Sequence, residues 1–257
     1  MPAPTNTFKS ALASGDLLLG CWAGFADPYA TEVLATAGYD WLVIDGEHAP
    51  NDLRSISAQL AVLRGQHSHP VVRLPMGEPW LIKQVLDAGA QSLLIPMVES
   101  AAEARDLVRA MRYPPDGIRG SGAALARASH FADIPDYIAT ANDQMCLLVQ
   151  VETRAGIDAL DEILAVDGVD GVFIGPSDLA ADMGHMGDAS QRDVAETIED
   201  ALARIRTAGR AAGILALDDA TIRRYRDWGA NFLAVGIDVV MLAQTARQTL
   251  AKWRADD

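Results

Sequence analysis

The sequence predicts a (β/α)8 barrel that occupies residues 1–257 as a single domain. Short apolar runs recur along the chain, and they are continuous rather than alternating, as in parallel strands that are buried on both faces. Helical apolar spacing fills the stretches between them. The length of 257 residues, half of them hydrophobic, suits one large α/β domain. A doubly wound open sheet is the alternative, but no GxGxxG sequence follows the first run to form a dinucleotide site.

The expected strands come in order along the chain, and eight of them would close a barrel. Two of the intervening helices, at residues 78–90 and 218–230, show helical spacing and end at a glycine. The predicted strands are LLLGCWAG (17–24), WLVID (41–45), PVVRL (70–74), SLLIPMV (92–98), CLLVQVE (146–152), GVFIG (171–175), AGILAL (212–217) and NFLAVGID (231–238).

Composition excludes several classes of function. A net charge of −14 argues against nucleic-acid binding, which needs clustered Lys and Arg. No apolar run is long enough to cross a bilayer, and the amino terminus lacks the basic and apolar segments of a signal peptide. Cys21 and Cys146 lie in strand-like runs, so we expect core residues rather than a disulfide, and a cytoplasmic location.

Lysine is too scarce to supply a Schiff base. Only Lys9, Lys83 and Lys252 occur, and none of them ends a predicted strand. An enzyme of this kind that stabilises a carbanion needs another electron sink, for which a divalent metal is the obvious choice.

The barrel prediction restricts where a site can lie, because active sites on this fold occupy the carboxyl ends of the strands. His67 and His69 resemble a metal pair but precede the third strand, so we interpret them as surface residues. The candidates at the carboxyl ends are Trp22, Asp45, Glu47, His48, Arg73, Gln150, Glu152 and the GPSD segment of residues 175–178.

Two carboxylates are placed to bind a metal. Gln150 and Glu152 are two residues apart and face the same side of a strand, with Glu152 at the mouth. Asp178 follows the next strand, where Pro176 suits a first helical turn and leaves the Ser177 amide free for an anion. Two hard oxygen ligands with open positions suit Mg2+, Mn2+ or Co2+ rather than a closed zinc site.

Each of these residues also has an ordinary explanation. Asp178 could cap a helix, and Glu152 could pair with Arg154. Their convergence with the other candidates on one rim favours a functional site.

Seven motifs together resemble the 4-hydroxy-2-oxoheptanedioate aldolase family, whose members are metal-dependent (class II) pyruvate aldolases of the phosphoenolpyruvate/pyruvate barrel superfamily. The resemblance covers essentially the whole chain, and DGEH followed by GPSDLAADMG is its most specific part. The motifs are WLVIDGEHAP, VVRLP, YPPDGIRG, ALARAS, IPDY, CLLVQVETR and GVDGVFIGPSDLAADMG.

The resemblance implies a role for most of the candidates. Glu152 and Asp178 would bind the metal, and pyruvate would chelate it. Arg73 would contact the keto oxygen, and His48 would act as acid and base with Asp45 orienting it. No role follows for Glu47, which we expect at the surface or behind the site. The candidates for substrate binding are Arg73, Gln150, Gly175, Ser177, Trp22 and Leu215.

The implied reaction is the retro-aldol cleavage of a 4-hydroxy-2-oxo acid to pyruvate and an aldehyde such as succinate semialdehyde, as in aromatic catabolism. A 2-keto-3-deoxy sugar-acid aldolase is the nearest alternative. A CoA-dependent lyase would need a surface for a nucleotide tail, and no clear basic segment offers one. A phosphoenolpyruvate mutase would need a phosphate loop. A non-catalytic binding protein with the same fold is a further alternative, which the loss of a site residue would favour.

The resemblance also implies a homo-oligomer, a hexamer built from dimers that exchange their C-terminal helices. The helix expected at residues 236–253 is apolar enough to be buried against something, within the chain or outside it. Asp87 and the long loop at residues 113–135 are candidates for contributing to a neighbour's site.

Overall fold

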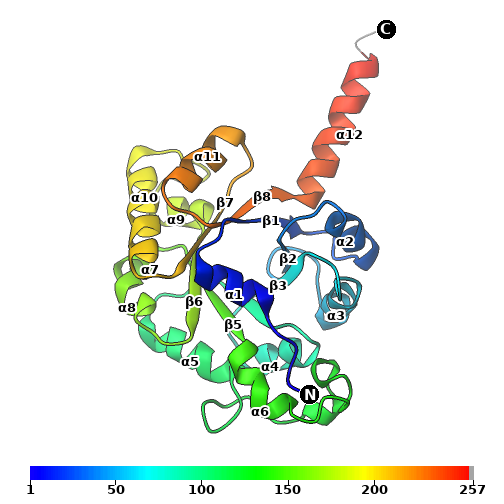
Figure 1. The fold of residues 1–257 in the computed structure, drawn as a ribbon. Coiled ribbons are helices and arrows are strands. Elements are labelled where there is room, and N and C mark those ends of the chain that lie inside the picture. The colour runs from blue at the N-terminus through cyan, green and yellow to red at the C-terminus, as the bar shows by residue number, and fades with distance from the viewer. Residues whose placement is uncertain (255–257) are drawn as a thin grey trace.

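The computed structural model describes residues 1–254, and it confirms the predicted (β/α)8 barrel. Eight parallel strands pair in chain order and close on themselves between β8 and β1 (Figure 1). Each predicted apolar run overlaps one strand, although β3, β6 and β7 begin one or two residues earlier than predicted. The strands are β1 Leu18–Ala23, β2 Trp41–Asp45, β3 His69–Arg73, β4 Ser92–Ile95, β5 Cys146–Val151, β6 Val169–Ile174, β7 Ala211–Leu215 and β8 Phe232–Ile237.

The helices surround the barrel, and the two whose ends were predicted stop as expected. Gly89 and Gly229 follow α4 and α11 with positive φ, a conformation that glycine adopts without strain. The helices are α1 Thr7–Ser14, α2 Pro28–Ala35, α3 Leu53–Val62, α4 Pro79–Asp87, α5 Ala101–Met111, α6 Tyr137–Ala141, α7 Arg154–Asp158, α8 Leu160–Leu164, α9 Pro176–Asp182, α10 Arg192–Thr207, α11 Asp219–Asp227 and α12 Asp238–Arg254, with short 3-10 turns at 123–125, 127–129 and 142–144.

Aromatic side chains fill the barrel interior. Trp41 packs against Trp22 and Phe232, and a side chain at Gly20 would collide with its indole ring. Helix α1 closes the amino end of the barrel, where Phe8 belongs to the same cluster. The barrel interior is therefore packed at this end.

His69 corrects one prediction. It lies at the amino end of β3, as expected, but it is half-buried and packs into the barrel instead of lying free on the surface. Its ring stacks on Phe8 at 5.0 Å, and its Nε2 is 2.9 Å from the Ser92 hydroxyl. Burial lowers the pKa of His69 to about 4, so its ring is neutral at pH 7 and packs at the amino end of the barrel.

The two cysteines are buried and unpaired, which confirms them as core residues. Burial, reinforced by the charge of Asp238, raises the pKa of the Cys21 thiol to about 12. Within residues 1–254, no helix has the length and apolar character needed to cross a membrane. A cytoplasmic location stays a prediction.

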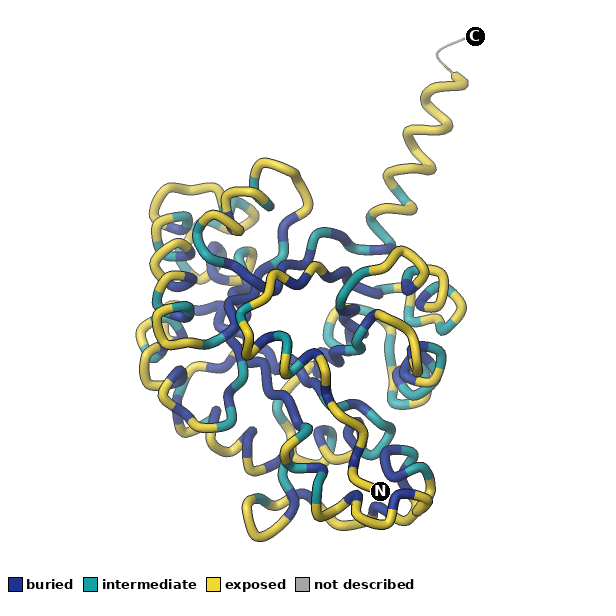
Figure 2. The backbone as a smooth tube through the Cα atoms, viewed as in Figure 1, coloured by how far each residue is buried: buried dark blue, intermediate teal, exposed yellow. Residues whose placement is uncertain are grey.

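Helix α12 leaves the barrel. It projects away from the other elements and is exposed along most of its length (Figures 1 and 2). Only its first residue, Asp238, is buried, whereas Leu242, Leu250 and Trp253 are more than half exposed. The apolar side chains of this helix therefore lack a covering surface within the described part of the chain.

Candidate active site

A cavity of about 570 Å3 opens at the carboxyl ends of the strands, where the sequence placed the site. Of the predicted residues, Glu47 and Glu152 lie next to its lining, and Asp87 lies elsewhere. The lining side chains and backbone come from Trp22, Gly24, Asp45, His48, Ala49, Pro50, Arg73, Gln150, Phe173, Gly175, Pro176, Ser177, Asp178, Leu215, Ile237, Val239 and Val240.

Arg73 is held between two carboxylates. It ends β3 directly opposite Asp45 on β2, so strand register brings the two side chains together. Its Nε donates to Asp45 Oδ1 at 2.8 Å and its Nη2 to Oδ2 at 2.7 Å, while Nη1 lies 2.8 Å from Glu47 Oε2. The guanidinium also lies over the Trp22 ring, 5.3 Å from its centroid. These contacts fix the guanidinium plane and leave its remaining N–H groups for a ligand.

Asp45 does not orient the His48 ring, and here the structure corrects the implied arrangement. Asp45 accepts from the backbone N–H groups of Glu47 and His48 at 3.0 and 3.4 Å, while Arg73 occupies both of its oxygens. The carboxylate near the imidazole is that of Glu47, whose Oε2 lies 3.8 Å from His48 Nε2. The imidazole itself is exposed at the mouth.

Glu47 lies beside the cavity, although no role for it follows from the sequence. Its position two residues after Asp45 was the available signal, since alternate residues of an extended segment face the same side. Burial raises its pKa, the charges of Arg73 and His48 lower it, and those of Asp45 and Asp178 raise it further. The pKa of Glu47 is therefore raised overall, although its carboxylate lies between a guanidinium and an imidazole.

Glu152 lies just beyond β5 and is almost completely buried. Its Oε1 accepts the Met97 N–H at 3.0 Å, and its Oε2 accepts from Gln150 Nε2. A side chain at Gly175 would collide with Glu152, so only glycine lets β6 end this close to it. Burial raises the pKa of Glu152, hydrogen bonds from Gln150 and Met97 lower it, and the charge of Asp178 raises it again.

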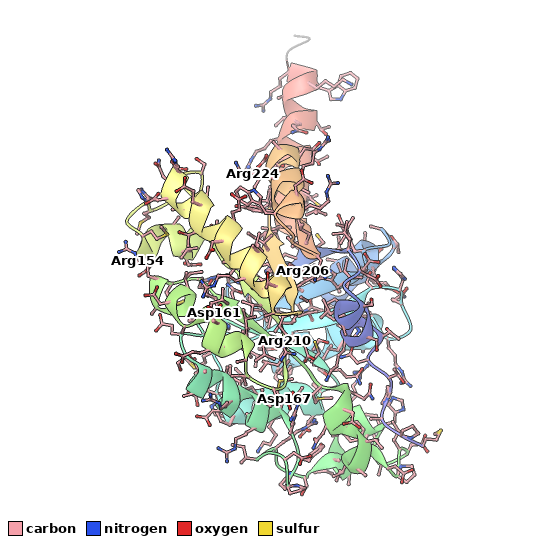
Figure 3. The ribbon with its side chains drawn as sticks, turned by 60° about the vertical axis from the view of Figure 1, so that its left-hand side comes forward. Arg154, Asp161, Asp167, Arg206, Arg210 and Arg224 are labelled. Carbon is pink, nitrogen blue, oxygen red and sulfur yellow. The ribbon has the colours of Figure 1, made fainter. Side chains whose placement is uncertain are left out.

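The ordinary explanations for the two carboxylates do not hold. Arg154 is on the outer surface, where it pairs with Asp182 at 3.9 Å rather than with Glu152 (Figure 3). Helix α9 begins after Gly175 and has no side-chain cap, so Asp178 lies in its first turn without capping it.

These residues fit a divalent cation. Glu152 and Asp178 offer hard oxygen donors, one buried and one exposed at the mouth, and the negative charge of Asp178 raises the pKa of the buried Glu152, a repulsion that a cation would relieve. The Oε1 atom of Gln150 is buried beside them without a hydrogen-bond partner. Within residues 1–254, no three His, Cys, Asp or Glu side chains are grouped to enclose an ion. A cation bound to this pair would keep positions open for other ligands.

Asp87 lies far from the cavity of its own chain. It ends α4 and precedes β4, which places it at the amino end of the barrel. Its Oδ1 accepts from Nη2 of the fully buried Arg119 at 2.8 Å. Asp87 is therefore not part of the cavity of its own chain, and a contribution to a neighbouring subunit's site stays a prediction.

Comparison with known proteins finds similarity over the whole barrel. Residues 18–245 match the family described as HpcH/HpaI aldolase/citrate lyase. A protein from Roseovarius nubinhibens named hydroxypyruvate/pyruvate aldolase is 98% identical over 257 residues, with 100% of both chains covered. A Salmonella dublin protein named 4-hydroxy-2-oxo-heptane-1,7-dioate aldolase is 53% identical over 98% of this chain and 95% of its own. The solved structure of an HpcH/HpaI aldolase/citrate lyase family protein from Burkholderia cenocepacia matches with a TM-score of 0.94 at 44% identity, covering 97% of this chain and 100% of the other.

Proposed function

The chain belongs to the HpcH/HpaI aldolase/citrate lyase family, and from this premise we propose that it cleaves 4-hydroxy-2-oxo acids with the help of a divalent cation. It is a carbon–carbon lyase of the aldolase type. The products are pyruvate or hydroxypyruvate and an aldehyde, since relatives are named for both 2-oxo acids. Mg2+, Mn2+ or Co2+ would serve.

The observation that carries the proposal is that hydrogen-bond donors and carboxylate oxygens face one cavity from different strands. Arg73 supplies fixed N–H donors on one side, and Glu152 and Asp178 supply oxygen ligands on the other. A 2-oxo acid with its carboxylate and keto oxygens fits between them. When bound, the cation supplies a positive charge that stabilises the enolate.

Arg73 binds and stabilises the oxygen on which charge develops. In the cleavage direction the carbon–carbon bond between C3 and C4 breaks, and its electrons move to the C2 keto oxygen. The free N–H groups of Arg73 donate to that oxygen, and they need no reorganisation because Asp45 and Glu47 already hold the guanidinium. The Ser177 N–H would bind the carboxylate end of the substrate beside Gln150, whereas the Gly175 N–H is donated to the Val151 carbonyl at 3.1 Å, so Gly175 would contribute space rather than a donor.

His48 moves the proton. Its imidazole at the mouth takes the 4-hydroxyl proton as the carbon–carbon bond breaks, and the released enolate is then protonated at C3. Glu47, rather than Asp45, is the carboxylate that would stabilise the imidazolium, since its Oε2 is the nearer one at 3.8 Å. Trp22 and Leu215 line the same cavity and would bound the substrate's apolar part.

Two features of the chain support assembly into a homo-oligomer. Helix α12 has exposed apolar side chains and no surface of its own chain to cover them, which supports exchange of this helix between subunits. Asp87 lies at the opposite end of the barrel from its own cavity, so a neighbour's site is the one it would serve. A hexamer built from exchanged dimers would satisfy both.

Cleavage of 4-hydroxy-2-oxoheptanedioate tests the proposal, with pyruvate release followed in time. We expect turnover to disappear with a chelator and to return with Mg2+, Mn2+ or Co2+. Undiminished activity in chelator would contradict the role of the cation. Cleavage of a CoA thioester in place of the hydroxy acid would favour the CoA-dependent lyase, and cleavage of a 2-keto-3-deoxy sugar acid alone would favour the sugar-acid aldolase.

A further inference from the structure

Met97 adopts a backbone conformation that its residue type disfavours. It follows β4 and has a φ of 56°, in the left-handed region that glycine, asparagine and aspartate tolerate best. An unfavourable backbone angle at a site persists only where the surroundings hold it in place.

The surroundings hold Met97 from both sides. Strands β4 and β5 pair as far as Ile95 and Val149, and the Val98 N–H then donates to the Gln150 carbonyl at 3.0 Å. Between these two anchors the chain turns, and the turn directs the Met97 N–H to Glu152 Oε1 at 3.0 Å. The left-handed angle is thus tied to one particular hydrogen bond.

The side chain of Met97 does not explain the conformation. It is 48% exposed, so it contributes little apolar burial that would offset the strain. The backbone N–H is the group that reaches the site. Together with Gln150 Nε2 on Oε2, it holds both oxygens of the Glu152 carboxylate.

We propose that Met97 is a positioning residue whose left-handed backbone aims its N–H at Glu152 and so fixes this carboxylate for cation binding. The inference rests on the proposed function, since it takes Glu152 as a ligand. Groups that orient a metal ligand typically contribute about 10–100-fold to metal affinity. Met97 would act in this way through its backbone alone.

A series of substitutions graded by left-handed propensity tests this inference. Met97→Gly and Met97→Asn tolerate the angle, whereas the β-branched Met97→Val and Met97→Ile oppose it. We measure the dissociation constant of Mn2+ by calorimetry on the purified full-length protein. Gly and Asn should stay within about threefold of the parent protein, and Val and Ile should weaken binding about tenfold or more.

Met76 provides the matched control, because it is an exposed methionine in the loop after β3. Met76→Val should leave Mn2+ affinity unchanged. Equal affinity in all four Met97 variants would overturn the inference, and so would a loss in the Gly and Asn variants, which would assign the effect to the side chain. If the parent protein itself binds no Mn2+, the proposed cation site fails as well.

A second measurement needs no substitution at Met97. The amide resonance of Met97 should shift when Mg2+ is added to the parent protein and stay in place in Glu152→Ala. An amide that does not respond to Mg2+ in a protein that binds it would overturn the inference even if the Val and Ile variants fail to fold.

Discussion

At the scale of the residue, Arg73 shows how neighbours determine the chemistry of a side chain. Asp45 and Glu47 balance its charge, and Trp22 packs on its face, so the guanidinium is buried without being free to turn. A lysine at this position would keep the charge but lose the two parallel bonds to Asp45. Geometry, rather than charge alone, therefore distinguishes the two residues.

Arg73→Lys should lower kcat for cleavage by about two decades, equivalent to about 3 kcal/mol of transition-state stabilisation. Steady-state kinetics with the same hydroxy acid measures the effect. Arg154→Lys is the control, because Arg154 pairs with Asp182 on the outer surface, and it should turn over normally. An Arg73→Lys enzyme with the parent kcat would remove Arg73 from the proposed role.

The raised pKa of Glu152 predicts how the stability of the metal-free protein depends on pH. Burial, with the charge of Asp178, raises this pKa above that of the unfolded chain. Between the two pKa values, Glu152 is protonated in the folded state and ionised in the unfolded state. Its contribution to the free energy of unfolding is therefore fully present below the pKa that it has in the unfolded chain, and it is lost as pH rises through the pKa that it has in the folded protein.

Urea unfolding at a series of pH values, with chelator present, measures this contribution. The free energy of unfolding of the parent protein relative to Glu152→Gln should fall as pH rises from below the ordinary glutamate pKa to neutrality. A difference that is constant or rises with pH would show that Glu152 has no raised pKa.

At the scale of the element, Asp238 joins two segments that line the cavity, the loop after β1 and the first turn of α12. Its Oδ1 accepts the Gly24 N–H at 2.8 Å and its Oδ2 the Phe25 N–H at 3.4 Å, so the loop after β1 is tied to the first turn of α12. Val239 and Val240 of this turn line the cavity. The position of one wall thus depends on a carboxylate at the base of α12.

Asp238→Ala should raise KM for the hydroxy acid about tenfold and change kcat less, because the wall shifts while the charged groups stay in place. The control is Asp218→Ala, which removes the comparable cap of α11, where Asp218 Oδ1 accepts the Thr221 N–H at 2.9 Å. That variant should lose about 1 kcal/mol of stability with an unchanged KM. Equal KM values in the two variants would contradict the link between α12 and the cavity.

The elements were largely predictable from the sequence, and the contacts between them were not. Every strand was found because a strand buried on both faces is a continuous apolar run. The carboxyl-end rule then located Arg73 and Glu152. The pairing of Asp45 with Arg73 depends on the register between β2 and β3. The backbone angle at Met97 depends on contacts of the flanking residues with β5. Neither contact can be predicted from the sequence of one segment alone.

At the scale of the whole molecule, α12 is the helix that extends beyond the barrel after its first turn. Leu242 and Leu250 are two turns apart, so they lie on one face of this helix, and both are more than half exposed. These exposed leucines support the proposed exchange of α12 between subunits. The sequence predicted that the helix would be covered but could not say whether by its own chain.

Introducing charge on this face should dissociate the oligomer. Leu242→Glu/Leu250→Glu should reduce the particle mass measured by light scattering, because carboxylates in an apolar contact lose hydration without a partner. Gln248→Glu adds a single carboxylate away from the line of these leucines and should keep the parent mass. A parent protein that is monomeric, or a double variant of unchanged mass, would contradict exchange of α12.

The most direct test of the account is exchange of the C3 protons of the 2-oxo acid, which needs no choice of aldehyde. Metal-stripped protein is incubated with pyruvate, and separately with hydroxypyruvate, in deuterated water, and NMR follows the loss of the C3 proton signal on addition of Mg2+ or Mn2+. The account predicts exchange that requires the cation and disappears in Glu152→Ala. Exchange that proceeds in chelator, or its absence in the cation-loaded parent protein, would contradict a cation-assisted enolate at this site.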